Sequence, residues 1–258
     1  MKMLIDKLSV AEYELLNKCI AWHVRPHQQV FLEGLTTIST SLRFDNLNVL
    51  ELGATARSTL SPFMIARGAN ATVTCYSEDE LPKLDGTLSQ IAQQYGLARE
   101  KFHVLQADIF ALDQKAMFDL VILKDVLGGV NRQHDQAEFR KAASNCLSIL
   151  NPNGQLLIID KARSLKVIHW ILKKLGSAGK NEWHYFTFDE LKQLIPDGSF
   201  EISFAAHGIL SFGNFGGGIF QKIADFLDEH YAERLVSLEK RAVFSLTCKA
   251  KVKSGTVA

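Results

Sequence analysis

A short glycine-containing segment of the sequence has the composition of a ligand-binding turn. Residues 48–52 are largely apolar but include Glu51, Gly53 follows them, and small residues lead into a helical stretch at 59–67. A turn of this kind, between a buried strand and a helix, lets a ligand approach backbone amides at the helix N-terminus. Ordinary strand-to-helix turns have the same composition, so this segment alone leaves both interpretations open.

Polar and acidic side chains follow the next two predicted strands. Ser77, Glu78 and Asp79 come after the second strand, and Asp108 comes after the third. An acid at such a position can accept both hydrogen bonds of a ribose diol. Because the carboxyl ends of parallel strands meet at one edge of the sheet, these side chains together predict a nucleoside pocket.

Over about residues 47–160 the sequence resembles the class I S-adenosylmethionine-dependent methyltransferases. Residues 49–53 are similar to the first motif of that family, and residues 118–121 to its fourth strand. Residues 150–157 are similar to the turn into the fifth strand, and Asp108 to the acid that contacts the adenine amine.

The resemblance implies S-adenosyl-L-methionine as the cofactor, lying across the ends of the first, second and fourth strands. Residues 123–127, together with the turn into the fifth strand, are most similar to small-molecule O-methyltransferases. The methyl acceptor is therefore expected to be a small apolar or aromatic molecule, with O-methylation favoured. The residues assigned to the cofactor are Glu51, Gly53, Ala54, Thr55, Arg57, Ser77, Glu78, Asp108, Ile109 and Lys124.

Two features depart from the pattern of the family. The glycines expected two and four positions after Gly53 are Thr55 and Arg57, which restrict the backbone and fill space near the amino-acid end of the cofactor. Arg57 could instead hold the methionine carboxylate through paired hydrogen bonds, or point to solvent. Gly128 stands directly after Leu127, where plant-type small-molecule O-methyltransferases have their general-base histidine. A base is therefore supplied elsewhere or is not needed.

Three side chains are candidate catalytic groups for an acceptor that must lose a proton. His134 lies in the loop after the fourth predicted strand, Asp125 lies near the end of that strand, and His184 lies in the aromatic segment 182–186. Each has an alternative role: His134 as a surface histidine, Asp125 as a capping or packing carboxylate, and His184 as a hydrophobic anchor. Methyl transfer itself depends mainly on the alignment and desolvation of donor and acceptor.

A metal site is not expected from the histidine spacing. His23 and His27 are four positions apart, but Pro26 interrupts the helix that would align their rings.

Short apolar runs alternate with helical stretches, and this pattern predicts an α/β fold of the Rossmann-like, doubly wound type. The sheet is expected to have seven strands, mostly parallel, with the last strand antiparallel as the resemblance implies. Strands are predicted at 48–52, 71–76, 102–106, 118–123, 155–160, 200–206 and 242–249. Helices are predicted at 59–67, 86–95, 136–150, 165–175 and 219–238, and a further helix begins at the capping box of Thr187 and Glu190. Two short helices within 9–38 form an N-terminal helical cap (1–45) on a methyltransferase domain (46–258), which has a helical insertion at about 207–240.

Composition disfavours several other classes of protein. The 29 Lys and Arg against 28 Asp and Glu give a formal net charge of +1, which disfavours nucleic acid as a partner. The apolar runs of the sequence are shorter than the roughly 18–20 residues of an integral membrane segment. The segment 163–180 is both basic and apolar, so it could rest on a membrane surface or form a solvated helix face. The glycine run from Gly216 to Gly218 could act as the hinge of a lid or form a turn. The four widely spaced cysteines fit a reducing compartment, so we expect a cytoplasmic protein. The sequence also leaves open whether the protein forms a homodimer.

Competing hypotheses remain for the function. The first is a methyltransferase acting on a small molecule, and the second is a methyltransferase-like binding or partner protein without turnover. Thr55, Arg57 and Gly128 motivate the second hypothesis. A nicotinamide-dependent oxidoreductase is disfavoured, because residues 53–57 lack the second glycine that a pyrophosphate requires. Binding of S-adenosylmethionine distinguishes the first two hypotheses.

Overall fold

The computed structural model contains one seven-stranded sheet with the strand order β3-β2-β1-β4-β5-β7-β6. It describes residues 8–21, 23, 25–112, 117–130, 135–163, 170, 183–196, 198–210 and 218–251. The strands are β1 (Asn48–Leu52), β2 (Asn70–Cys75), β3 (Phe102–Gln106), β4 (Phe118–Lys124), β5 (Leu150–Lys161), β6 (Phe200–His207) and β7 (Val243–Ala250). β7 pairs antiparallel with both β5 and β6, and the remaining pairs are parallel. The predicted fold class, with its last strand antiparallel, is confirmed.

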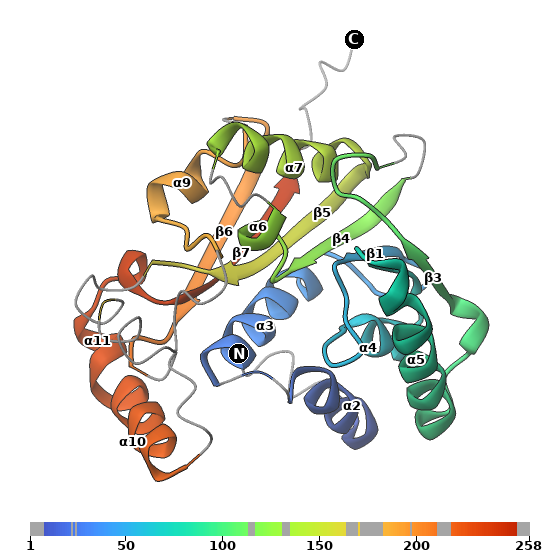
Figure 1. Cartoon of the computed structure of the whole chain (residues 1–258), viewed down its shortest axis with the longest axis horizontal. Helices are drawn as coiled ribbons and strands as arrows, with labels where there is room; N and C mark the ends of the chain where they lie inside the picture. Colours follow the sequence, from blue (N-terminus) through green and yellow to red (C-terminus); the bar gives the residue numbers. More distant parts are fainter. Residues whose placement is uncertain are drawn as a thin grey trace.

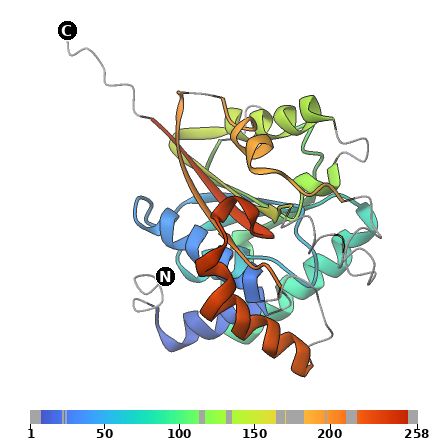
Figure 2. The same cartoon turned by 90° about the vertical axis from the view of Figure 1, so that its left-hand side faces the viewer.

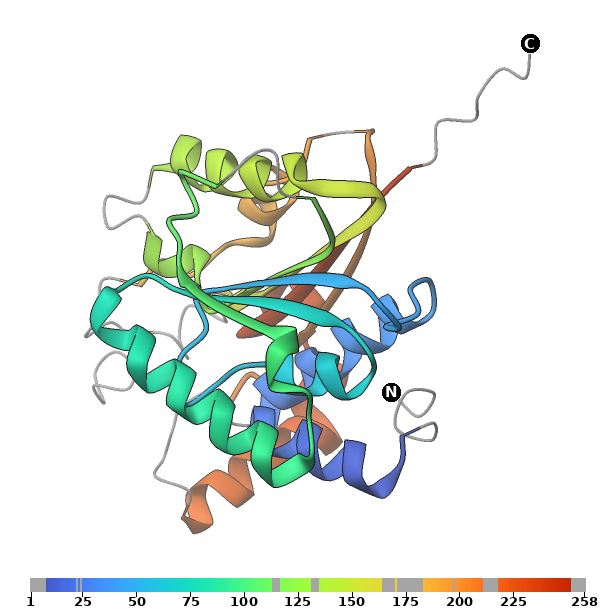
Figure 3. The same ribbon diagram turned by 90° about the vertical axis from the view of Figure 1, so that its right-hand side faces the viewer.

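Helices cover both faces of the sheet (Figure 1). α2 (Val10–Ile20), α3 (Arg25–Ser39), α4 (Ser61–Ala66) and α5 (Leu81–Tyr95) lie on one face, and α6 (Leu127–Val130), α7 (Gln136–Ser148) and α9 (Phe188–Lys192) lie on the other. Figure 3 shows α5 running alongside the β2 and β3 end of the sheet.

The alternation of side chains along the central strands explains this three-layer arrangement. On β4, Leu120 and Ile122 belong to the core beneath α2 to α5, whereas Val121 and Leu123 belong to the core beneath α7. All four side chains are fully buried. Strands buried on both faces require such unbroken apolar runs, which the sequence supplies.

The two N-terminal helices share one core with the sheet. Val30, Phe31 and Leu35 of α3 are fully buried in the same cluster as Leu157 of β5 and Val243 of β7. α2 begins at a capping box formed by Ser9 and Glu12, and its buried side chains join this cluster. The segment expected as a cap therefore contributes two helices, α2 and α3, to one helical layer of the fold.

The boundaries of some predicted elements differ from those in the structure. α5 begins at Leu81, with a proline in its first turn, rather than at residue 86. β5 begins at Leu150 and includes the predicted turn, where Asn153 has a φ of 69° and the pairing with β4 shifts register. The capping box of Thr187 and Glu190 is present at the start of α9.

The predicted helix at 219–238 is divided into shorter segments. α10 (Ile219–Leu227) leads into a π-helical turn, η3 (Asp228–Ala232), and then α11 (Glu233–Leu235). The buried carboxylate of Asp228 accepts hydrogen bonds from the backbone N–H groups of Ile209 and Leu210 at 2.9 and 3.0 Å, which ties the turn to the segment after β6. Figure 2 shows α10 and α11 beside the β6 edge of the sheet.

Several predictions lie outside the described residues. They are His134, the helix at 165–175 and residues 164–180 of the segment 163–180, in both cases apart from Trp170, together with Glu182, Gly216 and Gly217. Among the described residues, none of the helices has both the length and the apolar character needed to cross a membrane.

Candidate active site

The candidate site lies where β1 and β4 run side by side at the centre of the sheet. From β1 the strand order continues outward through β2 and β3, and from β4 it continues through β5, so the carboxyl ends of these strands form a topological switch point. Gly53 follows β1 with a φ of 70°, and Asp125 follows β4 with a φ of 50°. A Cβ atom on Gly53 would collide with the side chain of Val126. The two loops therefore pack against each other, and glycine is required at position 53.

Glu51 fixes the turn that follows β1. Its side chain is fully buried and accepts hydrogen bonds from the Thr59 hydroxyl at 2.7 Å and the Leu60 N–H at 2.9 Å. The N–H and hydroxyl of Ser61 also donate to it, at 2.9 and 2.6 Å. These donors lie at the start of α4, so the carboxylate caps that helix and holds the loop in place.

The tip of the loop is a tight turn. The Thr55 N–H donates to the Ser58 carbonyl at 3.3 Å, and the Ser58 N–H donates to the Thr55 carbonyl at 3.0 Å. Ala54 is buried, whereas Thr55 and Arg57 are exposed at the tip. These two residues stand where the first motif of the methyltransferases that the sequence resembles has glycines, and in this turn their side chains are exposed instead of filling the core.

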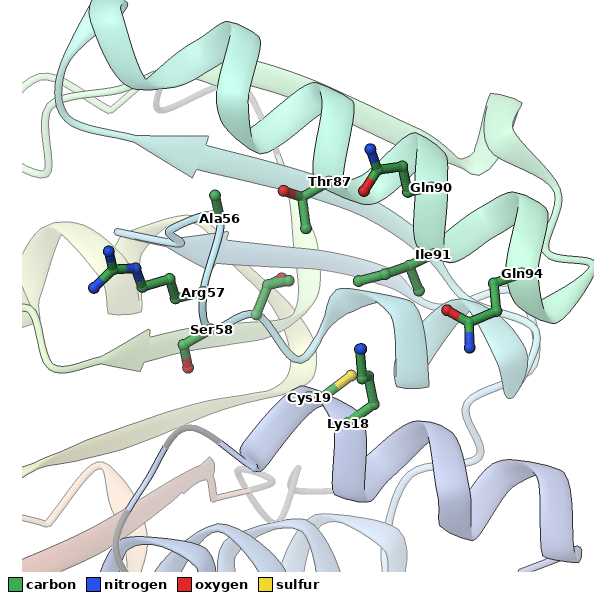
Figure 4. A pocket seen from close by; sticks show the side chains of 10 residues that line it. Lys18, Cys19, Ala56, Arg57, Ser58, Thr87, Gln90, Ile91 and Gln94 are labelled. Atoms are coloured by element: carbon green, nitrogen blue, oxygen red, sulfur yellow. The ribbon is translucent and has the colours of Figure 1, made fainter. Parts of the chain in front are cut away.

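A cavity of about 240 Å³ lies between this turn, α2 and α5 (Figure 4). Lys18 and Cys19 of α2 and Gln90 of α5 contribute to its lining, together with Arg57. The guanidinium of Arg57 extends away from Gln90 in Figure 4. Burial raises the pKa of the Cys19 thiol to about 12, so this group is not a nucleophile at neutral pH.

The residues expected to bind the nucleoside follow β2 and β3, which pair in parallel up to Cys75 and Gln106. Ser77 caps a short 3₁₀ helix, η1 (Glu78–Glu80), and Glu78 and Asp108 are exposed. Asp108 accepts a hydrogen bond at 2.9 Å from the backbone N–H two residues later, and Ile109 is buried. The pairing of β2 with β3 places the two exposed carboxylates at the same edge.

A cluster of titratable side chains lies at the end of β4. Asp125 Oδ2 is 4.0 Å from His23 Nδ1, and Oδ1 is 3.8 Å from His27 Nε2. Lys161 Nζ lies 3.6 Å from Asp125 Oδ1, and the Ser58 hydroxyl lies 2.6 Å from His23 Nε2. One cluster thus receives residues from the α2–α3 connection, the start of α3, the β1 turn and the ends of β4 and β5.

The charges in this cluster are strongly perturbed. Burial and the neighbouring Lys124 lower the pKa of His23 to about 3, so this imidazole is neutral at physiological pH. Burial also lowers the pKa of Lys124, which is 4% exposed. Burial acts to raise the pKa of Asp125, but His27, Lys161 and Lys124 hold it below its ordinary value. Asp125 is consequently a stable carboxylate and a weak proton acceptor.

A second buried carboxylate lies behind this cluster. Asp160 accepts hydrogen bonds from the Gly128 N–H and from the Trp183 indole, both at 3.0 Å. Burial and the charge of Asp125 raise the pKa of Asp160 to about 6. The Lys161 ammonium lies 4.0 Å from the centre of the Trp183 ring, which gives a cation–π contact.

Trp183 explains the glycine at position 128. A Cβ atom there would collide with the indole and would lie 2.7 Å from the carbonyl oxygen of His184. The volume next to this backbone is thus occupied by tryptophan, and a histidine side chain has no room at Gly128.

The three candidate catalytic residues have different surroundings. Asp125 lies at the switch point, and His134 lies outside the described residues. His184 is 7% exposed, packs against Phe139 and Phe186, and has Nε2 3.3 Å from Glu190 Oε1. These contacts are those of a residue anchored in the core.

Several members of the cluster were not expected from the sequence. The helix is interrupted before His27, since α3 begins at Arg25, but the expectation that this interruption leaves the rings of His23 and His27 unaligned is wrong, because they stack with centroids 5.3 Å apart. Pro26 lies in the first turn of α3, where a helix tolerates proline, and His23 reaches the cluster from before the helix. Asp160 and Lys161 come at the end of the fifth strand, and the rule that singled out Asp108 could have found them.

The strand order and the antiparallel β7 define the fold as that of the class I methyltransferases. Comparison with solved structures agrees. Magnesium protoporphyrin IX methyltransferase (ChlM) from Synechocystis PCC 6803, with bound SAH, is 15% identical, with a TM-score of 0.56 over 97% of this chain and 100% of that chain. A SAM-dependent methyltransferase from Methanosarcina mazei is 16% identical, with a TM-score of 0.56 over 84% of this chain and 98% of that chain.

A further structural neighbour is named for a different reaction. The [4+2]-cyclase SpnF is 14% identical, with a TM-score of 0.57 over 94% of this chain and 93% of that chain. No protein-family model matches the sequence, and no curated protein matches it either. The similarity therefore establishes the fold, and the reaction must be argued from the site.

Proposed function

We propose that this protein is an S-adenosylmethionine-dependent methyltransferase acting on a small apolar or aromatic acceptor, with O-methylation favoured. The observation that carries the proposal is the position of two exposed carboxylates, Glu78 and Asp108, at the edge of a sheet with class I strand order. Gly53 lies at the same edge, at the switch point where open α/β sheets bind their ligands.

The residues at this edge fit the parts of S-adenosylmethionine. Glu78 is suited to the ribose diol, Asp108 to the adenine amine, and the exposed guanidinium of Arg57 to the methionine carboxylate. Ser77 and Ile109 complete the nucleoside end, and Thr55 and Lys124 the amino-acid end. When bound, this cofactor supplies an electrophilic methyl group.

The acceptor is proposed to lie beside Asp125. A carboxylate whose pKa is held low is a poor general base, so Asp125 is better suited to orienting a polar group of the acceptor than to removing its proton. The neutral His23 imidazole, whose pKa is about 3, is also a weak base. Rate enhancement at this site would therefore come mainly from alignment and from exclusion of water.

The alternative is a methyltransferase-like binding protein without turnover. Thr55 and Arg57 in place of glycines favour it, and the name of the cyclase neighbour supports the view that this fold also serves other reactions.

Titration calorimetry with S-adenosylmethionine and S-adenosylhomocysteine tests the proposal directly. We expect micromolar binding, weakened about tenfold or more by Gly53→Val, which blocks the loop, and by Asp108→Ala, which removes a hydrogen-bond acceptor. Glu100→Gln, on an exposed side chain of the 3₁₀ helix η2 (Arg99–Lys101), is the matched control and should bind like the natural protein.

Absence of binding at millimolar cofactor would favour the binding-protein alternative. Unchanged affinity in both Gly53→Val and Asp108→Ala would refute the location of the pocket.

A further inference from the structure

Two imidazoles and one carboxylate converge at the switch point. One ligand atom from each of His23, His27 and Asp125 lies within 4.8 Å of the other two. The two nitrogen-to-oxygen distances, 4.0 Å for His23 and 3.8 Å for His27, exceed those of hydrogen bonds. The two imidazoles and the carboxylate thus lie close together at ion-pair distances, with ring stacking between the two histidines.

The two nitrogen-to-oxygen distances are compatible with atoms that share one metal ion. Two atoms each about 2.1 Å from a common ion lie roughly 3.0 Å apart at a right angle and roughly 4.2 Å apart on opposite sides. Both nitrogen-to-oxygen distances, one to each oxygen of Asp125, fall within this range. Two imidazoles and one carboxylate are also a donor set that zinc and ferrous ions accept while keeping open positions.

The surroundings orient two of the three ligands. The Ser58 hydroxyl lies 2.6 Å from Nε2 of His23, which leaves Nδ1 as the nitrogen that faces Asp125. Such outer hydrogen bonds commonly fix the orientation of metal-binding histidines. Asp125 adopts a φ of 50°, and its N–H donates to the Ile159 carbonyl at 2.8 Å. This backbone conformation is costly for a residue other than glycine, and strain of this kind is typical of functional sites.

Lys161 competes with a metal ion for the same carboxylate. Its ammonium lies 3.6 Å from Asp125 Oδ1, and Lys124 adds a second positive charge nearby. Three carboxylates, those of Glu51, Asp125 and Asp160, oppose these two ammonium groups. The cluster therefore has no excess of positive charge to exclude a cation, and Lys161 sets how tightly one binds.

We propose that His23, His27 and Asp125 form a binding site for a divalent transition-metal ion of the zinc or ferrous type. Ser58 orients His23 within this site. A bound ion would hold an oxygen of the acceptor and favour its ionised form, and this role rests on the proposed function. Binding of the ion itself does not depend on that function.

Metal titration of the full-length protein tests the site. After removal of metal by a chelator, Zn²⁺ is titrated by calorimetry and Co²⁺ by visible absorption, both without cofactor. We expect about one ion per chain, and a Co²⁺ spectrum typical of mixed nitrogen and oxygen ligands. His27→Ala and Asp125→Asn should each lower the affinity at least tenfold.

Lys161→Met should change the affinity in the opposite direction. Because it removes the competing ammonium group, we expect it to raise Zn²⁺ affinity several-fold. His103→Ala, on an exposed histidine of β3, is the matched control and should bind as the natural protein does.

The proposal would be overturned by absence of stoichiometric Zn²⁺ or Co²⁺ binding, by unchanged affinity in His27→Ala and Asp125→Asn, or by weaker binding in Lys161→Met. Circular dichroism identifies a variant that fails to fold. If His27→Ala fails to fold, the metal affinities of the isosteric Asp125→Asn variant and of Lys161→Met test the site instead. A parallel titration with S-adenosylhomocysteine separates failure of the metal site from failure of the cofactor site.

Discussion

Substitution of Glu51 by glutamine tests whether this residue supports the loop or contacts the cofactor. Glu51 Oε2 accepts hydrogen bonds from the side chain of Thr59 and from both the N–H and the hydroxyl of Ser61. Oε1 accepts from the Leu60 N–H at 2.9 Å. In Glu51→Gln, an amide NH₂ at the Oε1 position would face that N–H, which would keep only its 3.0 Å contact with Oε2, and every donor would lose the carboxylate charge.

The magnitude follows from these contacts. A hydrogen bond to a charged group contributes about 1.5–3 kcal/mol, so a loss equivalent to one such bond costs about 1.5–3 kcal/mol. For a chain of this size, 1 kcal/mol corresponds to about 2–4 °C in Tm. We therefore expect Glu51→Gln to lower the Tm by roughly 3–12 °C.

Differential scanning calorimetry and urea unfolding measure this effect, with Glu100→Gln as the exposed control. The control should stay within about 0.5 kcal/mol of the natural protein. If Glu51→Gln retains full stability but loses S-adenosylhomocysteine binding, the structural role assigned to Glu51 is refuted and a direct contact with the cofactor takes its place.

Two further predictions concern pH and packing. His207 lies 3.0 Å from carboxylate oxygens of both Glu33 and Glu233, which raise its pKa from 6.5 to about 9 against the opposing effect of burial. Because folding raises this pKa, protonated His207 stabilises the folded protein, and the full contribution is present below pH 6.5. The contribution is at most about 3 kcal/mol, and it is lost as the pH rises towards 9. The free energy of unfolding, measured with urea, should therefore fall between pH 6.5 and 9 in the natural protein and fall less steeply in His207→Gln. Equal slopes against pH in the two proteins would contradict this role of His207. Gly128→Ala should lower the free energy of unfolding by about 1–3 kcal/mol and shift the fluorescence of Trp183, because the added methyl group has no room beside the indole. An unchanged free energy of unfolding and unchanged emission would show that this contact is absent.

The order of elements could be predicted from the sequence because it depends on local patterns. Apolar runs such as residues 118–123 are long enough for buried strands, and acids such as Asp108 mark strand ends through their position alone. The capping box of Thr187 and Glu190 is equally local, since both hydrogen bonds form within one helical turn.

Interruptions within predicted elements could not be foreseen in the same way. The segment 219–238 has a helical pattern, but Asp228 bonds to backbone N–H groups after β6, and it is this long-range contact that accompanies the π-helical turn. Tertiary contacts of this kind override local propensity.

The α/β layering, the glycine turn and the acidic strand ends can be read from the sequence, because each depends on residues that are neighbours in the chain. Which side chains meet at the switch point depends on the tertiary fold. His23, Ser58, Asp125 and Lys161 are far apart in the sequence, and they converge because the α2–α3 connection packs across the ends of adjacent strands. No periodicity connects such positions, so only the fold could bring two histidines, a carboxylate and a competing lysine together.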